Sequence, residues 1–443
     1  ATASYQVEGA AYEDGKGLNI WDIFCKDGGH IYENQTGDAA CDQYHRYKED
    51  VQIMKEMGMK AYRFSLSWAR IMPEGTGTVN EKGLKYYDNL INELLDNGIE
   101  PFVTLYHWDL PYALHLQGGW MNPNSPSWFY EYAKVVAEHF SDRVKNFFTI
   151  NEPQCIVGLG YQTGEHAPGL KVGPSDYFRI WHNVLKAHGR AVEALREFSK
   201  QPVKISMAPC GALYVPETNK PEDIEAARKA NFSLPENSIG ACSWDVALCC
   251  DPVYLGQYPE DILKEFGQFF PKVTDADMKL ISQPLDFFGQ NIYNAVTVRA
   301  GEDGKAVRAA RYDGFPQTAI GWPVTPEVLY WAPKFMQERY KKPFMITENG
   351  MASHDWVGVD GKVHDQARVD FMARYLGAYK RAAEDGVDLA GYFAWSVMDN
   401  FEWAYGYSQR FGLVYTDYNT QKRTWKDSAY FYKNIIETNG ENL

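Results

Sequence analysis

The sequence predicts one closed (β/α)8 barrel, the TIM-barrel class, as a single domain over residues 1–443. Short, nearly continuous apolar stretches alternate with helical patterns, and eight such stretches occur if the one at residue 1 is counted. Repeated strand–helix units with apolar strands favour a parallel sheet, and eight of them favour a closed barrel. No Pro/Gly/Ser-rich linker, composition break or repeat divides the chain. An open doubly wound sheet is the alternative, but no GxGxxG or GxxxxGK[ST] pattern follows any expected strand.

The first strand is expected to be under way at residue 1, because residues 1–9 read as a strand end and a loop; we expect several residues of this strand to precede Ala1. Later strands are β-branched or aromatic runs, and helices show apolar spacing with a stop such as Gly58 or Gly98. The other expected strands are 60–68, 100–106, 144–152, 202–208, 285–291, 343–348 and 389–395. The expected helices are 42–57, 81–97, 128–140, 175–199, 222–232, 238–249, 259–266, 325–340, 366–385 and 426–438, with a hairpin or loop at 300–314.

Charge and composition exclude several classes of partner. The chain has 58 acidic against 44 basic residues, a formal net charge of −14, which argues against binding nucleic acid or an anionic membrane. No apolar run reaches the roughly 18 residues that a membrane-spanning helix needs. The expected partner is therefore a small molecule, and the sequence does not indicate the oligomeric state.

The cysteines and histidines predict neither a disulfide framework nor a metal centre. Seven scattered cysteines without a CxxC pair fit a reducing compartment, so we expect a cytoplasmic protein; a signal peptide ahead of residue 1 is the alternative. The ten histidines are dispersed and no HExxH motif occurs. We expect no metal and no cofactor.

Two glutamates end two of the expected strands. Glu348 follows an apolar run and precedes the turn-forming pair Asn349-Gly350, and Glu152 precedes Pro153, which favours an extended backbone at Glu152. Strand ends of one barrel face a common cup, where such enzymes hold their catalytic residues. Two carboxyl groups in one cup are what cleavage of a glycosidic acetal requires, and their separation decides between retention and inversion.

Other polar and aromatic residues stand at the same strand ends. Taken singly, such residues are more often caps or surface groups, and we assign Glu8, Asp109 and Asp399 to structural roles. The set as a whole favours a site: Gln6, Arg63, His107, Trp108, Asn151, Asn291, Tyr293, Trp395, Glu402 and Trp403.

Six motifs in order give the chain a resemblance to the family 1 glycoside hydrolases, whose main members are β-glucosidases. The motifs are ATASYQVEGA at 1–10, YRFS at 62–65, LYHWDLP at 105–111, TINEP at 149–153, ITENG at 346–350 and NFEW at 400–403. The resemblance covers essentially the whole chain. It implies a (β/α)8 barrel and a retaining β-glycosidase that acts on cello-oligosaccharides or on aryl and alkyl β-glucosides, with β-galactosides and β-fucosides as further substrates.

The resemblance also implies roles for individual residues. Glu348 would be the nucleophile, supported by Arg63 and Tyr293, and Glu152 the acid/base, its pKa raised by apolar neighbours and by the nucleophile's charge. The implied sugar-binding residues are Gln6, His107, Trp108, Asn151, Asn291, Trp395, Glu402 and Trp403, and Trp322 resembles the platform for the aglycone.

Other activities of this superfamily fit less well. A 6-phospho-β-glycosidase would lack Glu402, whose charge repels phosphate, and would carry a lysine and a tyrosine near Gln409 and Phe411. A thioglucosidase would lack Glu152, and a sugar-binding barrel without turnover would usually lack one of the two glutamates. A transglycosylase would share every residue named above and stays an alternative.

Overall fold

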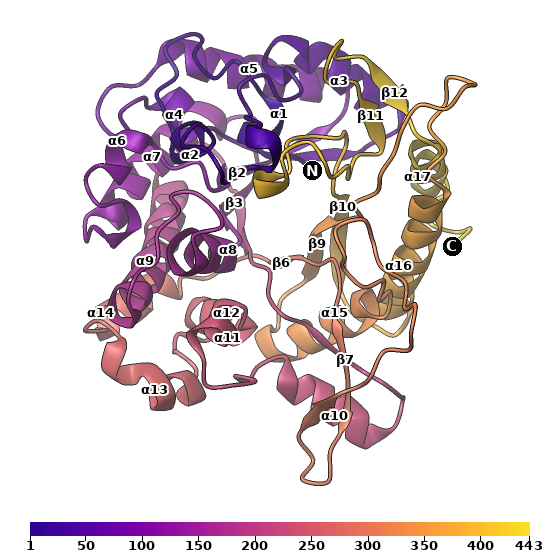
Figure 1. Cartoon of the computed structure of the whole chain (residues 1–443). Coiled ribbons are helices and arrows are strands. Elements are labelled where there is room, and N and C mark those ends of the chain that lie inside the picture. Colours follow the sequence, from indigo (N-terminus) through magenta and orange to yellow (C-terminus); the bar gives the residue numbers. More distant parts are fainter.

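Parallel strands form a barrel surrounded by helices in the computed structural model, which describes residues 1–443 (Figure 1). The strands form two parallel ladders in the orders β1-β2-β3-β4 and β6-β9-β10. Backbone hydrogen bonds join the ladders where β4 meets β6: Asp286 donates to Ile205 O at 3.0 Å and Asn291 to Pro209 O at 2.9 Å. The barrel strands are β1 (Ala61–Ser65), β2 (Glu100–Tyr106), β3 (Asn146–Asn151), β4 (Lys204–Ala208), β6 (Phe288–Asn291), β9 (Phe344–Asn349) and β10 (Leu389–Ala394). The predicted α/β barrel class is confirmed.

Residues 1–3 occupy the place of the first barrel strand. Thr2 N–H donates to Arg63 O of β1 at 2.9 Å, and the Ala1 ammonium donates to Ala394 O of β10 at 2.8 Å. The prediction of a loop up to residue 9 is wrong for Ser4–Val7, which form a helical turn, α1. The Glu8 N–H donates to Ser4 O at 2.9 Å in this turn.

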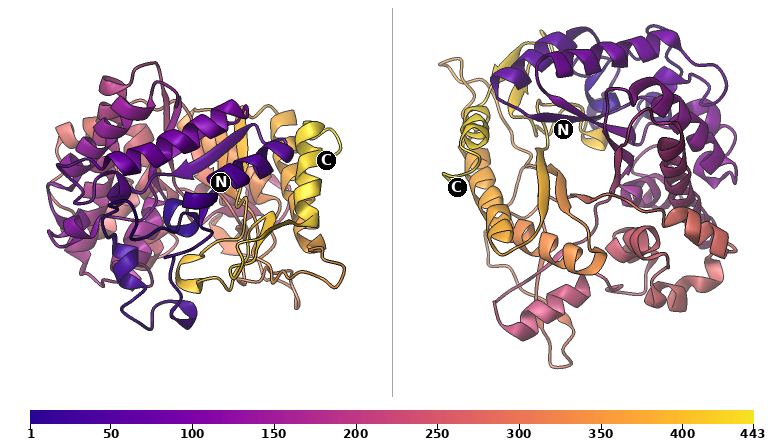
Figure 2. Two further views of the ribbon diagram at one scale, coloured as in Figure 1. Left: turned by 90° about the horizontal axis from the view of Figure 1, so that it is seen from above. Right: turned by 180° about the vertical axis from the view of Figure 1, so that it is seen from behind.

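An outer ring of helices covers the strands, and the views from above and from behind show them packed around the barrel wall (Figure 2). The longer helices are α3 (Gln43–Glu56), α5 (Glu81–Asp96), α7 (Ser125–Phe140), α9 (Pro174–Phe198), α10 (Pro221–Ala230), α12 (Val246–Leu255), α15 (Val328–Tyr340), α16 (Gln366–Glu384) and α17 (Asp427–Glu437). Shorter helices are α2 (Ile20–Phe24), α4 (Trp68–Ile71), α6 (Tyr112–His115), α8 (Pro153–Val157), α11 (Ile239–Ser243), α13 (Glu260–Phe266) and α14 (Asp275–Ile281). None of these helices combines the length and apolar content needed to cross a membrane.

Two predicted boundaries need correction. The single helix expected over 238–249 is two helices, α11 and α12, because the Asp245 side chain accepts the Leu248 N–H at 2.8 Å and so caps a new helix. The hairpin expected at 300–314 begins earlier, with β7 (Val296–Ala300) and β8 (Ala306–Arg308) antiparallel and β5 (Tyr214–Pro216) beside β7. This hairpin and α10 project from the lower edge of the molecule in Figure 1.

The two strands whose ends hold the glutamates are fully buried. Every residue of β3 and of β9 is buried, as expected for strands covered on both faces. Gly350, directly after β9, passes so close to the next strand that a Cβ there would lie 1.8 Å from Trp395 O. Only glycine allows this approach, which places the Glu348 turn against the end of β10.

Glu8, Asp109 and Asp399, which were predicted to have structural roles, each link separate segments of the chain. Glu8 pairs with Arg70 at 2.9 Å, and Asp109 accepts from the Ser4 hydroxyl at 2.6 Å. Asp399 is ion-paired with Lys426 at 2.7 Å and with Arg410 at 2.8 Å, at the base of a loop that ends in a second hairpin, β11 (Val414–Thr416) and β12 (Arg423–Trp425). None of the three acids lines the cavity described next.

Candidate active site

A cavity of about 660 Å³ opens at the carboxyl ends of the barrel strands. All but two of the predicted site residues line it: His107, Trp108, Asn151, Glu152, Asn291, Tyr293, Trp322, Glu348, Trp395, Glu402 and Trp403. Arg63 and Gln6 lie behind this lining, where they contact Glu348 and Glu402 respectively. The barrel thus brings together residues that are up to several hundred positions apart in the chain.

Glu348 is buried at the end of β9 between two donors. Its Oε1 accepts from Arg63 Nη1 at 2.9 Å, and its Oε2 accepts from the Tyr293 hydroxyl at 2.6 Å. Arg63 is itself buried. Its Nη1 also donates to Thr347 O, and its other two nitrogens donate to Thr104 Oγ1 and Asn151 Oδ1. A cation and a hydroxyl on separate oxygens stabilise the carboxylate form and fix its orientation.

Glu152 follows β3 in a left-handed backbone conformation, with φ 43° and ψ 71°. The extended backbone predicted from Pro153 is therefore wrong: the Glu152 N–H still donates to Ala208 O of β4 at 2.8 Å, while Pro153 already opens α8. The chain must turn sharply between these two constraints. Strained backbone of this kind is concentrated at functional sites, and here it directs the carboxyl group into the cavity.

The two side chains that donate hydrogen bonds to Glu152 are neutral. Its Oε1 accepts from Asn291 Nδ2 at 2.7 Å, and its Oε2 accepts from the Cys155 thiol at 3.0 Å. Burial, and secondarily the charge of Glu348, raise the pKa of Glu152 to about 7, against the opposing effect of these hydrogen bonds. This outcome agrees with the raised pKa expected from the sequence.

Amide side chains connect the two carboxyl groups. Asn291 Nδ2 donates to Asn151 Oδ1 at 3.0 Å as well as to Glu152, and Asn291 Oδ1 accepts from Thr347 Oγ1 at 2.6 Å. Asn151 Nδ2 lies 3.1 Å from His107 Nε2. Because the amide nitrogen can only donate, Nε2 is the acceptor and the proton of His107 is on Nδ1. Burial, with the nearby charge of Arg63, lowers the pKa of His107 well below its ordinary value, so the ring is neutral.

Gln6 and Glu402 form a second polar group on the wall. Gln6 Nε2 donates to Phe401 O at 2.8 Å and approaches Glu402 Oε2 at 3.5 Å, which leaves Gln6 Oε1 without a partner. Burial, followed by the charges of Glu348 and Glu152, raises the pKa of Glu402 to about 8. Glu402 is thus largely protonated at pH 7, which corrects the expectation that its own charge excludes a phosphate.

The tryptophans of the cavity have different surroundings. Trp108 donates its N–H to Asn151 O at 3.0 Å and packs on Trp403 with ring centroids 4.6 Å apart, so it supports the wall. Trp395 lies beside His107 with nearly parallel rings, 6.0 Å between centroids. Trp322 is half-buried beside Tyr293 and Phe411, as the predicted aglycone platform requires.

Several cavity residues were not predicted from the sequence. Trp244, between α11 and α12, and Phe411 add aromatic surface, and Cys155 and Cys210 add two thiols beside Glu152. Cys155 could have been noticed three positions after Glu152. Cys210 lies in the loop after β4 and carries no local signal.

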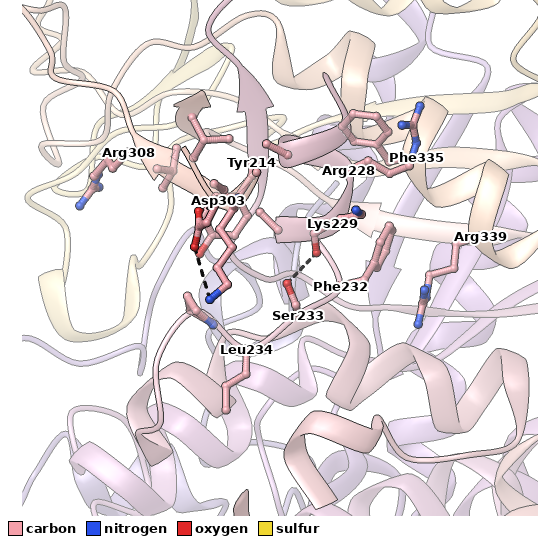
Figure 3. A pocket seen from close by; sticks show the side chains of 18 of the residues that line it. Tyr214, Arg228, Lys229, Phe232, Ser233, Leu234, Asp303, Arg308, Phe335 and Arg339 are labelled. Carbon is pink, nitrogen blue, oxygen red and sulfur yellow. Dashed lines mark hydrogen bonds and ion pairs between the residues drawn. The ribbon is translucent and has the colours of Figure 1, made fainter. Parts of the chain in front are cut away.

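A larger cavity, of about 1040 Å³, lies between α10, the β7–β8 hairpin and α15 (Figure 3). Its charged residues are largely paired: Arg228 with Glu338 at 2.9 Å, Arg339 with Asp251 at 2.6 Å and Lys305 with Asp303 at 3.5 Å. Its two carboxyl groups, Asp303 and Glu338, are both taken up by these ion pairs, so we place the chemistry in the cavity at the strand ends.

A barrel with two buried carboxyl groups at its strand ends is typical of enzymes that cleave glycosidic bonds. The model of glycosyl hydrolase family 1 matches residues 1–441. The chain belongs to glycosyl hydrolase family 1.

Relatives and solved structures agree with this assignment. Beta-glucosidase A of Thermotoga maritima is 46% identical over 443 residues, covering 99% of this chain and 96% of that protein. The 1,4-beta-D-glucan glucohydrolase of Thermotoga neapolitana is 45% identical, covering 99% and 97%. The solved β-glucosidase from Thermotoga maritima in complex with glucoimidazole has a TM-score of 0.89 at 46% identity, covering 99% of this chain and 97% of that one.

Proposed function

We propose that this protein is a retaining β-glucosidase that releases terminal β-D-glucosyl residues from cello-oligosaccharides or from aryl and alkyl β-glucosides. The observation that carries the proposal is the unequal surroundings of two carboxyl groups in one cavity. Glu348 is held by Arg63 and Tyr293, whereas the pKa of Glu152 is raised to about 7. Relatives named β-glucosidase and 1,4-β-D-glucan glucohydrolase support the substrate class.

In the first step, a carboxylate oxygen of Glu348 attacks the anomeric carbon. The bond from this carbon to the aglycone oxygen breaks, and the proton of Glu152 passes to that oxygen. The product is a covalent α-glucosyl ester of Glu348 and a free aglycone alcohol. Asn291 holds Glu152 Oε1 at 2.7 Å and so orients the carboxyl group toward the leaving oxygen.

In the second step, Glu152 acts in the opposite sense. Now ionised, it takes a proton from a water molecule whose oxygen attacks the anomeric carbon, and the ester bond to Glu348 breaks. Two inversions at one carbon give net retention of the β configuration. If a second sugar enters in place of water, the same step yields a new glycoside, which is the transglycosylation alternative.

Unpartnered polar atoms near the cavity fit the hydroxyls of a sugar. His107 Nδ1 is a donor without a partner and Gln6 Oε1 is an acceptor without one, and a buried polar group in that state carries a desolvation cost. Sugar hydroxyls both donate and accept, so one ring can satisfy both atoms. We assign these two residues, with Asn151, Glu402 and Trp403, to glucosyl recognition, and Trp395 to the apolar face of the ring.

A glucoside phosphorylated at the 6-position is disfavoured, because the loop after β10 offers no unpaired cation to bind the phosphate. Arg410, the cation in this loop, is ion-paired with Asp399 at 2.8 Å, and Gln409 and Phe411 carry no positive charge. A phosphate would also be repelled by the negative charge of the nucleophile Glu348, and nothing in the loop would offset that repulsion.

The test measures aryl β-D-glucoside hydrolysis and follows the anomeric form of the released glucose by NMR. We expect β-glucose as the first product, no turnover of the 6-phosphate, and loss of activity in Glu348→Ala. With azide added, Glu348→Ala should form α-glucosyl azide, because azide then replaces the missing nucleophile, whereas Glu152→Ala should form β-glucosyl azide from a dinitrophenyl glucoside. α-Glucose as first product, or the opposite azide anomers, would overturn the assignment.

A further inference from the structure

Two thiols stand beside the proposed acid/base residue. The ligand atoms of Glu152, Cys155 and Cys210 all lie within 4.8 Å of one another, and the Cys155 thiol donates to Glu152 Oε2 at 3.0 Å. No other three His, Cys, Asp or Glu side chains in the chain come this close together. All three residues line the cavity, so an ion can reach them without any opening of the fold.

The loops that carry these residues are fixed to each other. The buried Gln154 side chain donates to Cys210 O at 2.8 Å and accepts the Cys210 N–H at 3.2 Å. The Glu152 N–H donates to Ala208 O at 2.8 Å. Three hydrogen bonds therefore hold the loop after β4 against the start of α8, and the two thiols face each other without rearrangement of the backbone.

We propose that Glu152, Cys155 and Cys210 form a binding site for one thiophilic divalent ion, such as Zn²⁺ or Cd²⁺, that inhibits the enzyme. Two thiolates and a carboxylate are a favourable ligand set for such ions. Because all three residues line the cavity, water from the cavity can supply the fourth ligand. Bonds of about 2.0–2.3 Å place tetrahedral ligand atoms roughly 3.3–3.8 Å apart, which small side-chain rotations can reach here.

Binding needs no oxidant. Each thiol loses its proton to solvent and gives a sulfur lone pair to the ion. Glu152 binds as the carboxylate, so it releases its proton to solvent as well and gives an oxygen lone pair. The expected metals are soft ones, because hard cations such as Mg²⁺ prefer oxygen ligands and would not displace the thiol protons. While the ion is bound, Glu152 can neither deliver nor accept a proton. This inhibition rests on the proposed function, whereas the binding does not.

The test titrates the intact protein with Cd²⁺ and follows thiolate-to-cadmium charge-transfer absorption in the ultraviolet. We expect one equivalent to bind to the wild-type protein. Changes in the outer shell of a metal site already cost about 10- to 100-fold in affinity, so loss of a direct ligand in Cys155→Ala or Cys210→Ala should cost at least as much. Cys242→Ala is the matched control, because Cys242 is a buried free thiol that does not line the cavity.

A parallel assay measures inhibition of aryl β-glucoside hydrolysis by Cd²⁺, as the ratio of inhibited to uninhibited rate within each variant. Inhibition should weaken in Cys210→Ala, persist in Cys242→Ala, and be reversed by a chelator. Equal loss of binding in Cys242→Ala, or unchanged binding in both cavity variants, would overturn the site. Reversal by a reductant but not by a chelator would indicate a disulfide and overturn it as well. A protein that binds Cd²⁺ through these thiols but hydrolyses no glucoside would contradict the proposed function and leave the site standing.

Discussion

The two sides of the cavity treat the same residue type in opposite ways. Glu348 and Glu152 are both almost fully buried, with 4% and 7% of their surface exposed, and both stand at the ends of barrel strands. On the β9 side, a guanidinium and a phenol meet the carboxylate, whereas on the β3 side an amide and a thiol meet it, and no cation does. Because burial is similar, the two carboxyl groups differ mainly in the side chains that bind them.

Glu152→Gln removes the proton donor from the β3 side and should have the largest effect among the following changes. General acid catalysis contributes about 10²- to 10⁴-fold, so we expect a loss of this size for cellobiose, whose leaving alcohol needs protonation. The first step with a dinitrophenyl glucoside should be nearly unaffected, as burst kinetics can measure.

The same variant tests the pH dependence of the wild-type enzyme. The protonated form of Glu152 is the active one in the first step, and its fraction falls as pH rises through about 7, so kcat/KM should decline there. In Glu152→Gln this alkaline limb should vanish. An alkaline limb at the same place in the variant would assign the proton donor to another group.

Arg63→Met makes the β9 side resemble the β3 side by removing its cation. Removal of one electrostatic partner from a buried site typically costs about 10²- to 10³-fold in kcat, and we expect a loss in that range. Arg63→Lys, which keeps the positive charge but not the several N–H donors of the guanidinium, should retain part of the activity. Thermal unfolding of both variants is the control, since a loss of activity that simply follows loss of folded protein would speak against the electrostatic role.

Tyr293→Phe removes only the hydroxyl from Glu348 Oε2. A hydrogen bond to a charged group is worth about 1.5–3 kcal/mol, so kcat should fall roughly 10- to 100-fold, while the aromatic packing against Trp322 is kept. The measurement is steady-state kinetics with two leaving groups of different acidity. An unchanged kcat with both would mean that Arg63 alone holds the nucleophile.

Cys155 gives the smallest and most selective change. Its thiol donates to Glu152 and thereby opposes the rise of the Glu152 pKa, so Cys155→Ala should move the alkaline limb of kcat/KM upward. Cys155→Ser, with a stronger donor, should move it downward. A shift in the same direction for both variants would indicate a packing effect instead of a hydrogen bond.

The barrel and most of its site were predictable because both depend on local patterns. Apolar runs followed by a polar residue locate strand ends, and parallel strands of a barrel bring those ends to one face. This pattern located His107, Asn291 and Trp395, although it does not reveal which residues they contact. The assignment of their roles came from the family motifs and stays a proposal.

What escaped prediction depends on side-chain contacts between distant segments. The left-handed Glu152 results from competition between the Ala208 carbonyl and Pro153, and a proline rule alone gives the wrong answer. The break at Asp245 is set by a capping bond whose strength a helical pattern does not reveal. Glu402 was expected to be charged, but burial, and secondarily two carboxyl groups that lie far from it in the chain, raise its pKa.

Arg63 connects the site to the assembly of the barrel. Its guanidinium bonds to Thr104 of β2, Asn151 of β3 and Glu348 of β9, so it joins strands of both parallel ladders. A half-formed barrel would leave this buried cation without its acid, a state that costs several kcal/mol. The nucleophile is consequently positioned only when the two halves of the chain have met. During refolding, the return of glucosidase activity should therefore mark the moment at which the barrel closes, later than the recovery of helical structure.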